Sequence, residues 1–420
     1  MPRNFLLLAL AGLLVVLGCN GADGDSMSEI PLDAERDLPA VVEGGNLFAV
    51  DLYRKLGEGE GNLFFSPLSL STALAMTSAG AAGETKEEMA EVLHFPVDVE
   101  SVHPSLAALA ESLAKGSSLG DYRLDIANRL WGQPDFEFEQ DFLAVCREHY
   151  GAGFETLDFA KAPEKARVTI NRWVEQQTEK RIQDLLPPGS IEALTRLVLT
   201  NAVYFKGDWQ DQFDRQSTER APFFAEGVRE VEASLMMRKG DYRYVRFPGF
   251  QLLELPYIGD NLSMIVVLPA ARAGLAAIEA QLSHEKLTGW IGALAEKEVT
   301  VYLPRFEMKT GFSMSDTLSE MGMPSAFTPP QEGDPDSADF SRMTGARDLF
   351  IDGVFHKAFV MVNEEGTEAA AATGVTMSLT SMPAEPEIFR ADHPFLFLVR
   401  DRVTGSILFM GRLVDPGDEG

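Results

Sequence analysis

The spacing of apolar positions predicts amphipathic helices in the first half of the chain. The apolar residues of Ala49 to Leu56 fall on one helical face, so ordered structure is expected from about residue 46. The same spacing recurs in Thr85 to Leu93, in Pro104 to Lys115 and in Ile170 to Leu186. These segments are predicted to be helices that bury one face.

One strand pattern occurs in the first half of the chain, and strand patterns dominate the second half. Apolar residues alternate in Leu124 to Leu130 and again in Val299 to Leu303, and Ala358 to Val362 also resembles a strand. The apolar runs Phe395 to Val399 and Ile407 to Met410 flank a charged turn, which predicts a hairpin. Helices early and strands late indicate an α+β fold.

Composition limits the classes of partner. The chain has 420 residues and is 45% hydrophobic, enough for one large domain or two ordinary ones. It carries 36 Lys and Arg against 64 Asp and Glu, for a net charge of -28. Such a surface repels phosphate backbones, so no nucleic-acid partner is expected.

The N-terminus predicts export. Residues 1–18 contain the apolar run Phe5 to Gly18, the length of a signal-peptide core. Val16 to Cys19 resembles the bacterial lipobox, which implies that Cys19 carries a lipid. Residues 19–41 then form a flexible acidic tether. We therefore expect a membrane-anchored lipoprotein of the cell envelope or extracellular space; the alternative is an ordinary signal peptide with a chance cysteine.

Little in the sequence indicates catalysis. The one other cysteine, Cys146, lies in an apolar stretch and is expected to be a buried small side chain. The six histidines are dispersed, so no metal site is predicted, and no cofactor is expected.

The segment Gly116 to Gly120 matches the nucleophile-elbow pattern of α/β-hydrolases, with Ser118 as nucleophile. That motif requires a strand before it and a helix after it, whereas here a helix precedes and a strand follows. A serine hydrolase using Ser118 remains a remote alternative.

An unusual segment lies between two predicted strands. Glu364 to Gly374 is rich in alanine, and no Lys or Arg occurs between Glu365 and Arg390. A long loop inside a compact domain is usually functional. If the segment is extended, small residues occupy one face: Thr367, Ala369, Ala371 and Thr373.

The chain resembles the serpin family from about Val42 to Pro416. Five motifs occur in the family's order: Asn62 to Ser69, Asn201 to Trp209, Leu255 to Tyr257, Leu303 to Phe306 and Phe389 to Phe395. The resemblance implies a serpin domain at 42–416, with three sheets, eight or nine helices and an exposed reactive-centre loop at about 364–388.

The resemblance also implies roles for individual residues. Four polar residues match the shutter, a buried network where the main sheet parts: Ser66, Ser69, Asn201 and His356. Trp209 matches the breach, where insertion begins. The hinge of the loop comprises Glu364, Gly366, Thr367, Glu368, Ala369, Ala370, Ala371 and Ala372. Thr367 is expected to lie near solvent before cleavage.

The implied function is suicide inhibition of serine proteases. A protease cleaves the loop, which then inserts into the central sheet and traps the acyl-enzyme, so the chain is not itself an enzyme. The alternative within the family is a non-inhibitory binding protein or chaperone.

The family's spacing places the reactive bond at Thr380-Ser381, with Leu379-Thr380 as the nearest alternative. Without a basic residue there, elastase-, subtilisin- or chymotrypsin-like targets are favoured over trypsin-like ones. The acidic 89–115 segment argues against heparin binding, and a monomer is expected.

Overall fold

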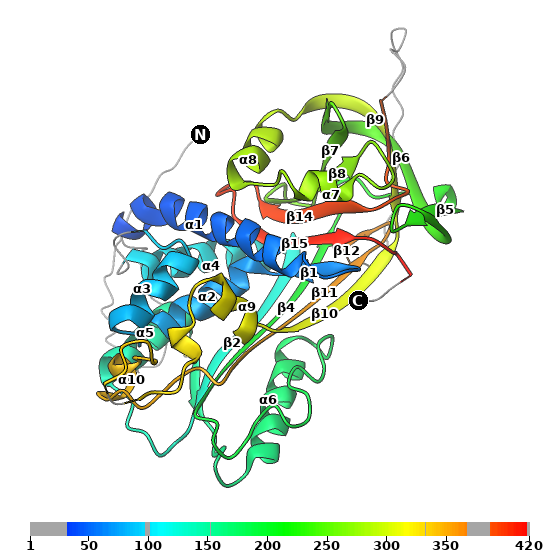
Figure 1. The fold of residues 1–420 in the computed structure, drawn as a ribbon. Coiled ribbons are helices and arrows are strands. Elements are labelled where there is room, and N and C mark those ends of the chain that lie inside the picture. The colour runs from blue at the N-terminus through cyan, green and yellow to red at the C-terminus, as the bar shows by residue number, and fades with distance from the viewer. Residues whose placement is uncertain (1–31, 97–100, 152, 332, 368–386, 418–420) are drawn as a thin grey trace, which may run out of the picture.

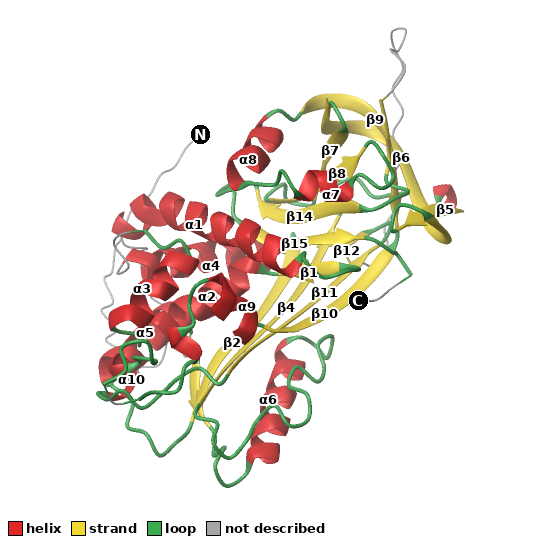
Figure 2. Ribbon diagram, viewed as in Figure 1, coloured by secondary structure: helices red, strands yellow, loops and turns green. Residues whose placement is uncertain are grey.

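The computed structural model describes residues 32–96, 101–151, 153–331, 333–367 and 387–417. The expected α+β fold is confirmed (Figure 2). The described part contains ten α-helical segments: α1 (Leu32–Leu56), α2 (Pro67–Ser78), α3 (Gly83–Val92), α4 (Val102–Ser118), α5 (Gln140–Tyr150), α6 (Pro163–Gln177), α7 (Leu275–Glu279), α8 (His284–Gly292), α9 (Ser315–Met321) and α10 (Ser341–Thr344).

Two hydrogen-bonded sheets organise these helices. The central sheet has the order β10-β11-β12-β4-β2-β3 and comprises β10 (Phe306–Ser313), β11 (Gly353–Val362), β12 (Gly366–Thr367), β4 (Leu197–Asp208), β2 (Tyr122–Gly132) and β3 (Phe154–Thr156). The second sheet has the order β1-β15-β14-β8-β7-β6-β9-β13, with β5 added to β6. Its strands are β1 (Leu63–Phe65), β5 (Glu219–Ala225), β6 (Arg229–Phe247), β7 (Phe250–Pro256), β8 (Leu262–Pro269), β9 (Ala295–Pro304), β13 (Glu387–Arg390), β14 (Phe395–Asp401) and β15 (Ile407–Leu413).

One long strand explains why two sheets appear where three were expected. The 19 residues of β6 pair with β9 from Leu235 to Tyr244 and with β7 from Arg243 to Phe247. Hydrogen bonding therefore continues through β6, so strands that were expected to form two separate sheets form one continuous sheet. The predicted hairpin is present, because β14 and β15 pair antiparallel.

The helices lie on both faces of the central sheet (Figure 1). Helices α1 to α5 cluster on one face, and α6 lies alone across the other. We call the α6 side the outer face. Residues of β4 alternate between these faces: Val203 and Phe205 pack inward, whereas Ala202 and Tyr204 pack outward with Val174 of α6.

Two helices differ from the sequence-based expectation. The first begins at Leu32. Val41 lies in one buried cluster with Val102 and Val42 in another with Leu109, burial that the acidic flanking sequence did not predict. The ordered chain therefore starts within the segment expected to be a tether. Helix α6 ends at Gln177, although apolar spacing continued to Leu186. The segment beyond it forms turns in which Glu179, Lys180 and Asp184 have positive φ, while its apolar side chains still face the core.

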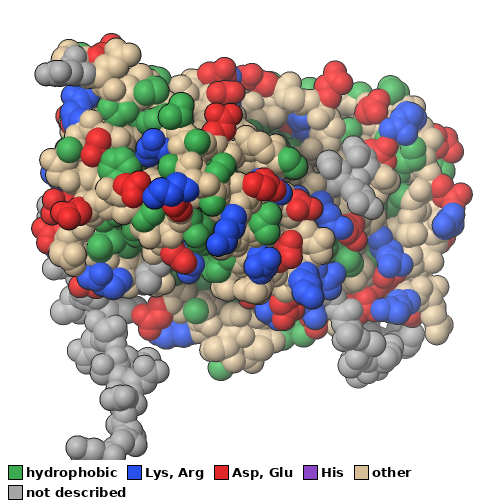
Figure 3. Space-filling model, turned by 90° about the horizontal axis from the view of Figure 1, so that it is seen from below, with side chains coloured by type: hydrophobic (Ala, Val, Ile, Leu, Met, Phe, Trp, Pro, Cys, Tyr) green, Lys and Arg blue, Asp and Glu red, His purple; other side chains and the backbone are tan. Residues whose placement is uncertain are grey.

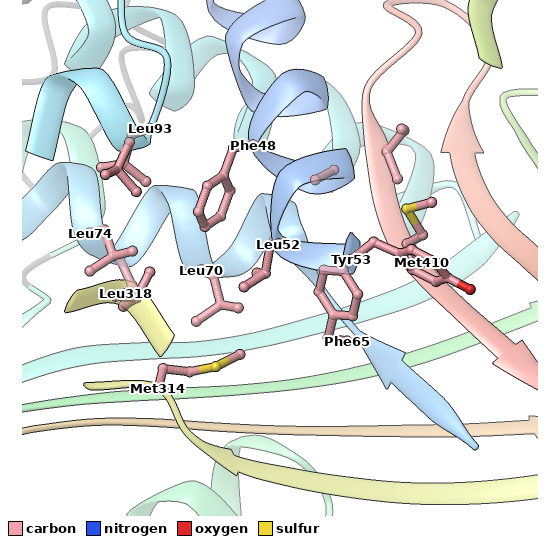
Figure 4. Packing of buried hydrophobic residues seen from close by; sticks show 14 of the residues in the cluster. Phe48, Leu52, Tyr53, Phe65, Leu70, Leu74, Leu93, Met314, Leu318 and Met410 are labelled. Atoms are coloured by element: carbon pink, nitrogen blue, oxygen red, sulfur yellow. The ribbon is translucent and has the colours of Figure 1, made fainter. Parts of the chain in front are cut away.

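The main core lies between the helical cluster and the two sheets. Figure 4 shows side chains from α1, α2, α9 and the residue just before α9 meeting there, among them Phe48, Leu52, Leu70, Leu74, Met314 and Leu318. All six are at most 1% exposed. Full burial of such a side chain contributes about 1.5–3 kcal/mol, so this packing fixes the helices against the central sheet.

Candidate functional site at the hinge and central sheet

The hinge enters the central sheet between β11 and β4. Thr367 pairs antiparallel with Val362 on β11 and with Gly207 on β4. Gly366 approaches β4 so closely that a Cβ at this position would lie 2.2 Å from the Gly207 carbonyl oxygen. Only glycine fits this approach. The described end of the loop is therefore already a strand of the sheet.

The burial of Thr367 corrects the expectation that its side chain lies near solvent. It is 0% exposed, and its hydroxyl lies 2.9 Å from the hydroxyl of Tyr257. Burial raises the pKa of the Tyr257 hydroxyl well above its ordinary value, so that group stays protonated and can donate. The difference arises because β12 fills the gap between β11 and β4.

Two glutamates hold the hinge from its N-terminal side. Glu364 and Glu365 are 3% and 4% exposed. Glu364 accepts a hydrogen bond of 2.7 Å from the hydroxyl of Thr218 and lies 3.6 Å from Arg305. Glu365 pairs with Arg215. Buried carboxylates require such partners, so these contacts fix the path of the chain into β12.

Trp209 lies beside the hinge and contacts its backbone. The indole Nε1 donates to the carbonyl of Asn363 at 3.0 Å, and the Trp209 amide donates to the carbonyl of Glu365 at 2.8 Å. The ring stacks on Tyr257 with centroids 4.7 Å apart and planes 14° apart. The residue assigned to the breach is thus in direct contact with the hinge.

The four residues assigned to the shutter lie together farther along the central sheet, where His356 of β11 pairs with Asn201 of β4, six positions from the residues that pair with Thr367. Asn201 donates to the Ser69 hydroxyl at 2.6 Å, and its side-chain oxygen bonds to Nδ1 of His356. The Ser66 amide donates to Nε2 of His356 at 3.2 Å. Because β11 carries His356 and β4 carries Asn201, their bond crosses the line along which the sheet would part.

A fifth residue, Asn128, belongs to this network and was missed by the sequence analysis. Its side-chain oxygen accepts from Asn201 at 2.5 Å and from the Ser69 hydroxyl at 3.0 Å. It faces Asn201 directly across β2 and β4. A signal was present, because position 128 interrupts the apolar alternation of Leu124, Ile126 and Leu130.

The network holds His356 in its neutral form. The ring is 1% exposed, and burial lowers its pKa to about 3. Nε2 accepts from the Ser66 amide, so the ring proton resides on Nδ1 and is donated to Asn201. A charged imidazolium could not accept that bond.

The other predicted positions fall into two groups. Ser118 lies at the end of α4, and its hydroxyl donates to the Lys115 carbonyl at 2.8 Å, as expected for a helix-to-strand connection. Cys146 is buried, and burial raises the pKa of its thiol to about 12. The remaining positions lie outside the described residues: Cys19, Glu368, Ala369, Ala370, Ala371, Ala372, Thr380 and Ser381.

Comparisons with known proteins identify the class. Residues 43–416 match the family model "Serpin (serine protease inhibitor)". The chain is 42% identical over 379 residues to leukocyte elastase inhibitor of Equus caballus, covering 88% of this chain and 97% of the relative. It is 37% identical to antithrombin-III of Mus musculus, covering 93% of this chain and 85% of the relative.

Solved structures agree. Uncleaved ovalbumin superposes with a TM-score of 0.80 at 30% identity, covering 90% of this chain and all of that one. Arabidopsis AtSerpin1 in its native stressed conformation gives 0.80 at 29% identity, covering 90% and 99%. The chain belongs to the serpin family. This membership confirms the expectation that the protein is a serine protease inhibitor and not an enzyme.

The expected localisation is wrong. Leukocyte elastase inhibitor and serpin B6, which the chain resembles over most of its length, are intracellular serpins and not exported, membrane-anchored lipoproteins. The export prediction rested on the apolar run Phe5 to Gly18, and the lipid anchor on the four residues ending at Cys19, all of which lie outside the described residues. No helix within the described ranges has the length and apolar character needed to cross a membrane.

Proposed function

We propose that this serpin inhibits serine proteases by cleavage of its loop and insertion of the cleaved strand between β11 and β4. The observation that carries this proposal is the pairing of Thr367 with both strands. Further insertion would lengthen an existing strand, and each added rung replaces one β11–β4 contact with two antiparallel ones. The serpin domain spans residues 42–416 in this proposal.

The sequence beyond the hinge supports inhibition over the non-inhibitory alternative. The residues that follow Thr367 on the inward face are small: Ala369, Ala371 and Thr373. Such side chains enter a packed sheet without clashes, whereas bulky or charged ones would stall insertion.

We further propose Thr380-Ser381 as the reactive bond, with elastase-, subtilisin- or chymotrypsin-like enzymes as targets. Similarity to leukocyte elastase inhibitors and the absence of basic residues between Glu365 and Arg390 support this choice. The acidic surface favours neither heparin nor nucleic acid as a partner.

The deciding experiment is incubation with a panel of elastase-, subtilisin-, chymotrypsin- and trypsin-like proteases. Covalent complexes on denaturing gels, with protease activity lost in proportion, are the expected result. Mass measurement of the released C-terminal fragment identifies the cleaved bond. Cleavage without any complex would support the non-inhibitory alternative.

Specificity has its own test. Thr380→Arg places a cation where a trypsin-like enzyme has an acidic pocket, so this variant should inhibit trypsin while the parent does not. Ser381→Arg is the matched control, because it adds the same charge on the other side of the proposed bond. If Ser381→Arg rather than Thr380→Arg gains trypsin inhibition, the assigned bond is wrong.

A further inference from the structure

The central sheet consists of two halves that meet at the seam between β11 and β4. In one half, β2 pairs with β4 along all 11 residues of β2. In the other half, β10 pairs with β11 along all 8 residues of β10. Insertion of a strand at the seam would move the halves apart by one strand spacing, about 4.8 Å. A segment bound to both halves would then have to lose a contact or lengthen.

One segment on the outer face crosses this seam. Residues 178–186, which we call the strap, follow α6 and return to it, because Leu186 exchanges two hydrogen bonds with Asn171 at 2.8 and 2.9 Å. Ile182 of the strap lies in one buried cluster with side chains of β2, β4 and β11: Ala127, Tyr204 and Phe359. The strap therefore covers strands from both halves of the sheet.

The strap is anchored to each half by a polar contact. On β2, the Arg123 guanidinium pairs with the Glu179 carboxylate at 2.6 Å, and the two side chains are 42% and 56% exposed. On β11, the half-buried Lys357 donates from Nζ to the Gln183 carbonyl at 2.9 Å. These two anchors lie on opposite sides of the seam, so the strap links the halves.

The backbone beside the Arg123 anchor is strained. Glu179 and Lys180 have φ of 48° and 64°, in the left-handed region that residues other than glycine rarely adopt. Such conformations persist only where surrounding contacts impose them, and they recur in segments that move. The ion pair of Glu179 is one contact that holds the strap in this form.

The Arg123–Glu179 pair acts locally. Arg123 also donates to Asp125 on its own strand at 2.7 Å. Over the side of the molecule on which α6 lies, basic and acidic side chains are interspersed rather than segregated (Figure 3). No broad field of one sign acts on the strap, so removal of the Arg123 charge should affect mainly the two carboxylates that it contacts.

We propose that Arg123 is a positioning residue for insertion, because its ion pair with Glu179 holds the strap across the two halves of the central sheet and so slows their separation. This inference rests on the proposed inhibitory function. The strap cannot follow both halves when β11 moves away from β4, so one anchor has to break. Removal of either anchor leaves the strap on one half only, and the seam then opens without breaking a polar contact of the strap.

The test measures the ratio of cleaved free inhibitor to covalent complex after reaction with pancreatic elastase. This ratio reports the rate of deacylation relative to that of insertion. Arg123→Gln should lower it about threefold, the effect of one partly exposed ion pair, and Glu179→Gln should do the same. In 1 M NaCl, which screens the pair, the ratio of the parent should fall to that of Arg123→Gln.

A double variant distinguishes the strap from two independent contacts. Lys357→Met, which removes the other anchor, should also lower the ratio about threefold. Arg123 and Lys357 do not touch, so independent effects would multiply to about ninefold in Arg123→Gln/Lys357→Met. If the strap slows separation only while both anchors hold, the double variant should show no more than the threefold decrease of either single variant.

Asp125→Asn is the matched control. It removes the other carboxylate that Arg123 contacts and leaves the strap anchored, so its ratio should equal that of the parent. An equal decrease in Asp125→Asn and Arg123→Gln would refute the role of the strap. Urea midpoints verify that each variant folds, and Lys357→Gln replaces Lys357→Met if the latter does not.

The outcomes separate the two proposals. If the parent forms no covalent complex with any protease of the panel, the proposed function fails. If the parent forms complexes but Arg123→Gln has an equal or higher ratio, or the double variant reaches about ninefold, the role of Arg123 is refuted. A parent that traps elastase, with single and double variants that lower the ratio equally, would support the strap.

Discussion

Acidification should weaken this protein through His356. Burial lowers the pKa of the ring to about 3 in the folded chain, against 6.5 for an ordinary histidine. Below pH 6.5 the unfolded chain therefore binds a proton that the folded chain excludes. The free energy of unfolding falls as the pH drops from 6.5 towards 3 and is unaffected by this group above pH 6.5.

The magnitude follows from the same two values. At pH 5 the unfolded histidine lies 1.5 units below its own pKa, which corresponds to a loss of about 2 kcal/mol. A loss of this size is a large fraction of the 5–15 kcal/mol that usually stabilises a domain. His103 contributes in the same direction, because burial lowers its pKa to about 4. The pH dependence of the parent's stability therefore combines the two histidines, and a variant is required to separate their contributions.

The slope of stability against pH isolates the proton bound at His356. Urea unfolding, followed by tryptophan fluorescence, gives the free energy of unfolding at several pH values between 5 and 6. The slope of that free energy against pH should be lower in His356→Gln than in the parent by about 1.4 kcal/mol per pH unit, which corresponds to about one proton. Loss of packing around the substituted residue lowers the free energy of unfolding equally at every pH, so it does not change the slope. Ser66→Ala is the control, since it removes the hydroxyl bond to Leu408 without removing a titrating group. Equal slopes for His356→Gln and the parent would refute the reasoning.

The remaining predictions concern the hinge and the cysteine. Gly366→Ala should expel the hinge, because its Cβ would lie 2.2 Å from the Gly207 carbonyl oxygen, and a Glu-specific protease should then cut at Glu364 or Glu365 faster than in the parent. Thr367→Val should cost about 1 kcal/mol in urea by losing the Tyr257 bond, whereas Thr367→Arg, which buries a guanidinium, should lower the midpoint further and abolish the covalent complex; an unchanged midpoint in Thr367→Arg would contradict the burial of this side chain. Cys146 should resist a thiol reagent at pH 8 until urea exposes it, because burial raises its pKa to about 12.

The sequence predicted best the features that depend on local periodicity. The hairpin of β14 and β15 and the helix preceding Ser118 needed only the spacing of apolar residues over a few turns. The continuation of apolar spacing beyond Gln177 misled the same reasoning, because Ile182 reaches the core from a turn as well as it would from a helix.

The burial of the hinge could not be predicted in this way. Thr367 is small and polar, and its own segment resembles an exposed loop. It is buried because Gly207, far away in sequence, and Val362, on the strand just before the hinge, leave a space of one strand between them. Similarly, Asn128 is polar within an apolar alternation, and only its pairing with Asn201 across β2 and β4 shows why. Such residues break local patterns because they serve the sheet and not their own element.

The positions of hinge and shutter also determine the order in which the sheet would open. Below Thr367, seven register pairs join β11 to β4, from Phe359↔Tyr204 down to Gly353↔Val198, and the His356–Asn201 pair is the fourth from the top. An extending strand must separate these pairs in that order. Contacts between the hinge and the sheet at Thr367 would therefore act before any pair is broken and influence whether insertion begins. The buried bond of His356 would break only after several new rungs have formed, when their hydrogen bonds already favour completion.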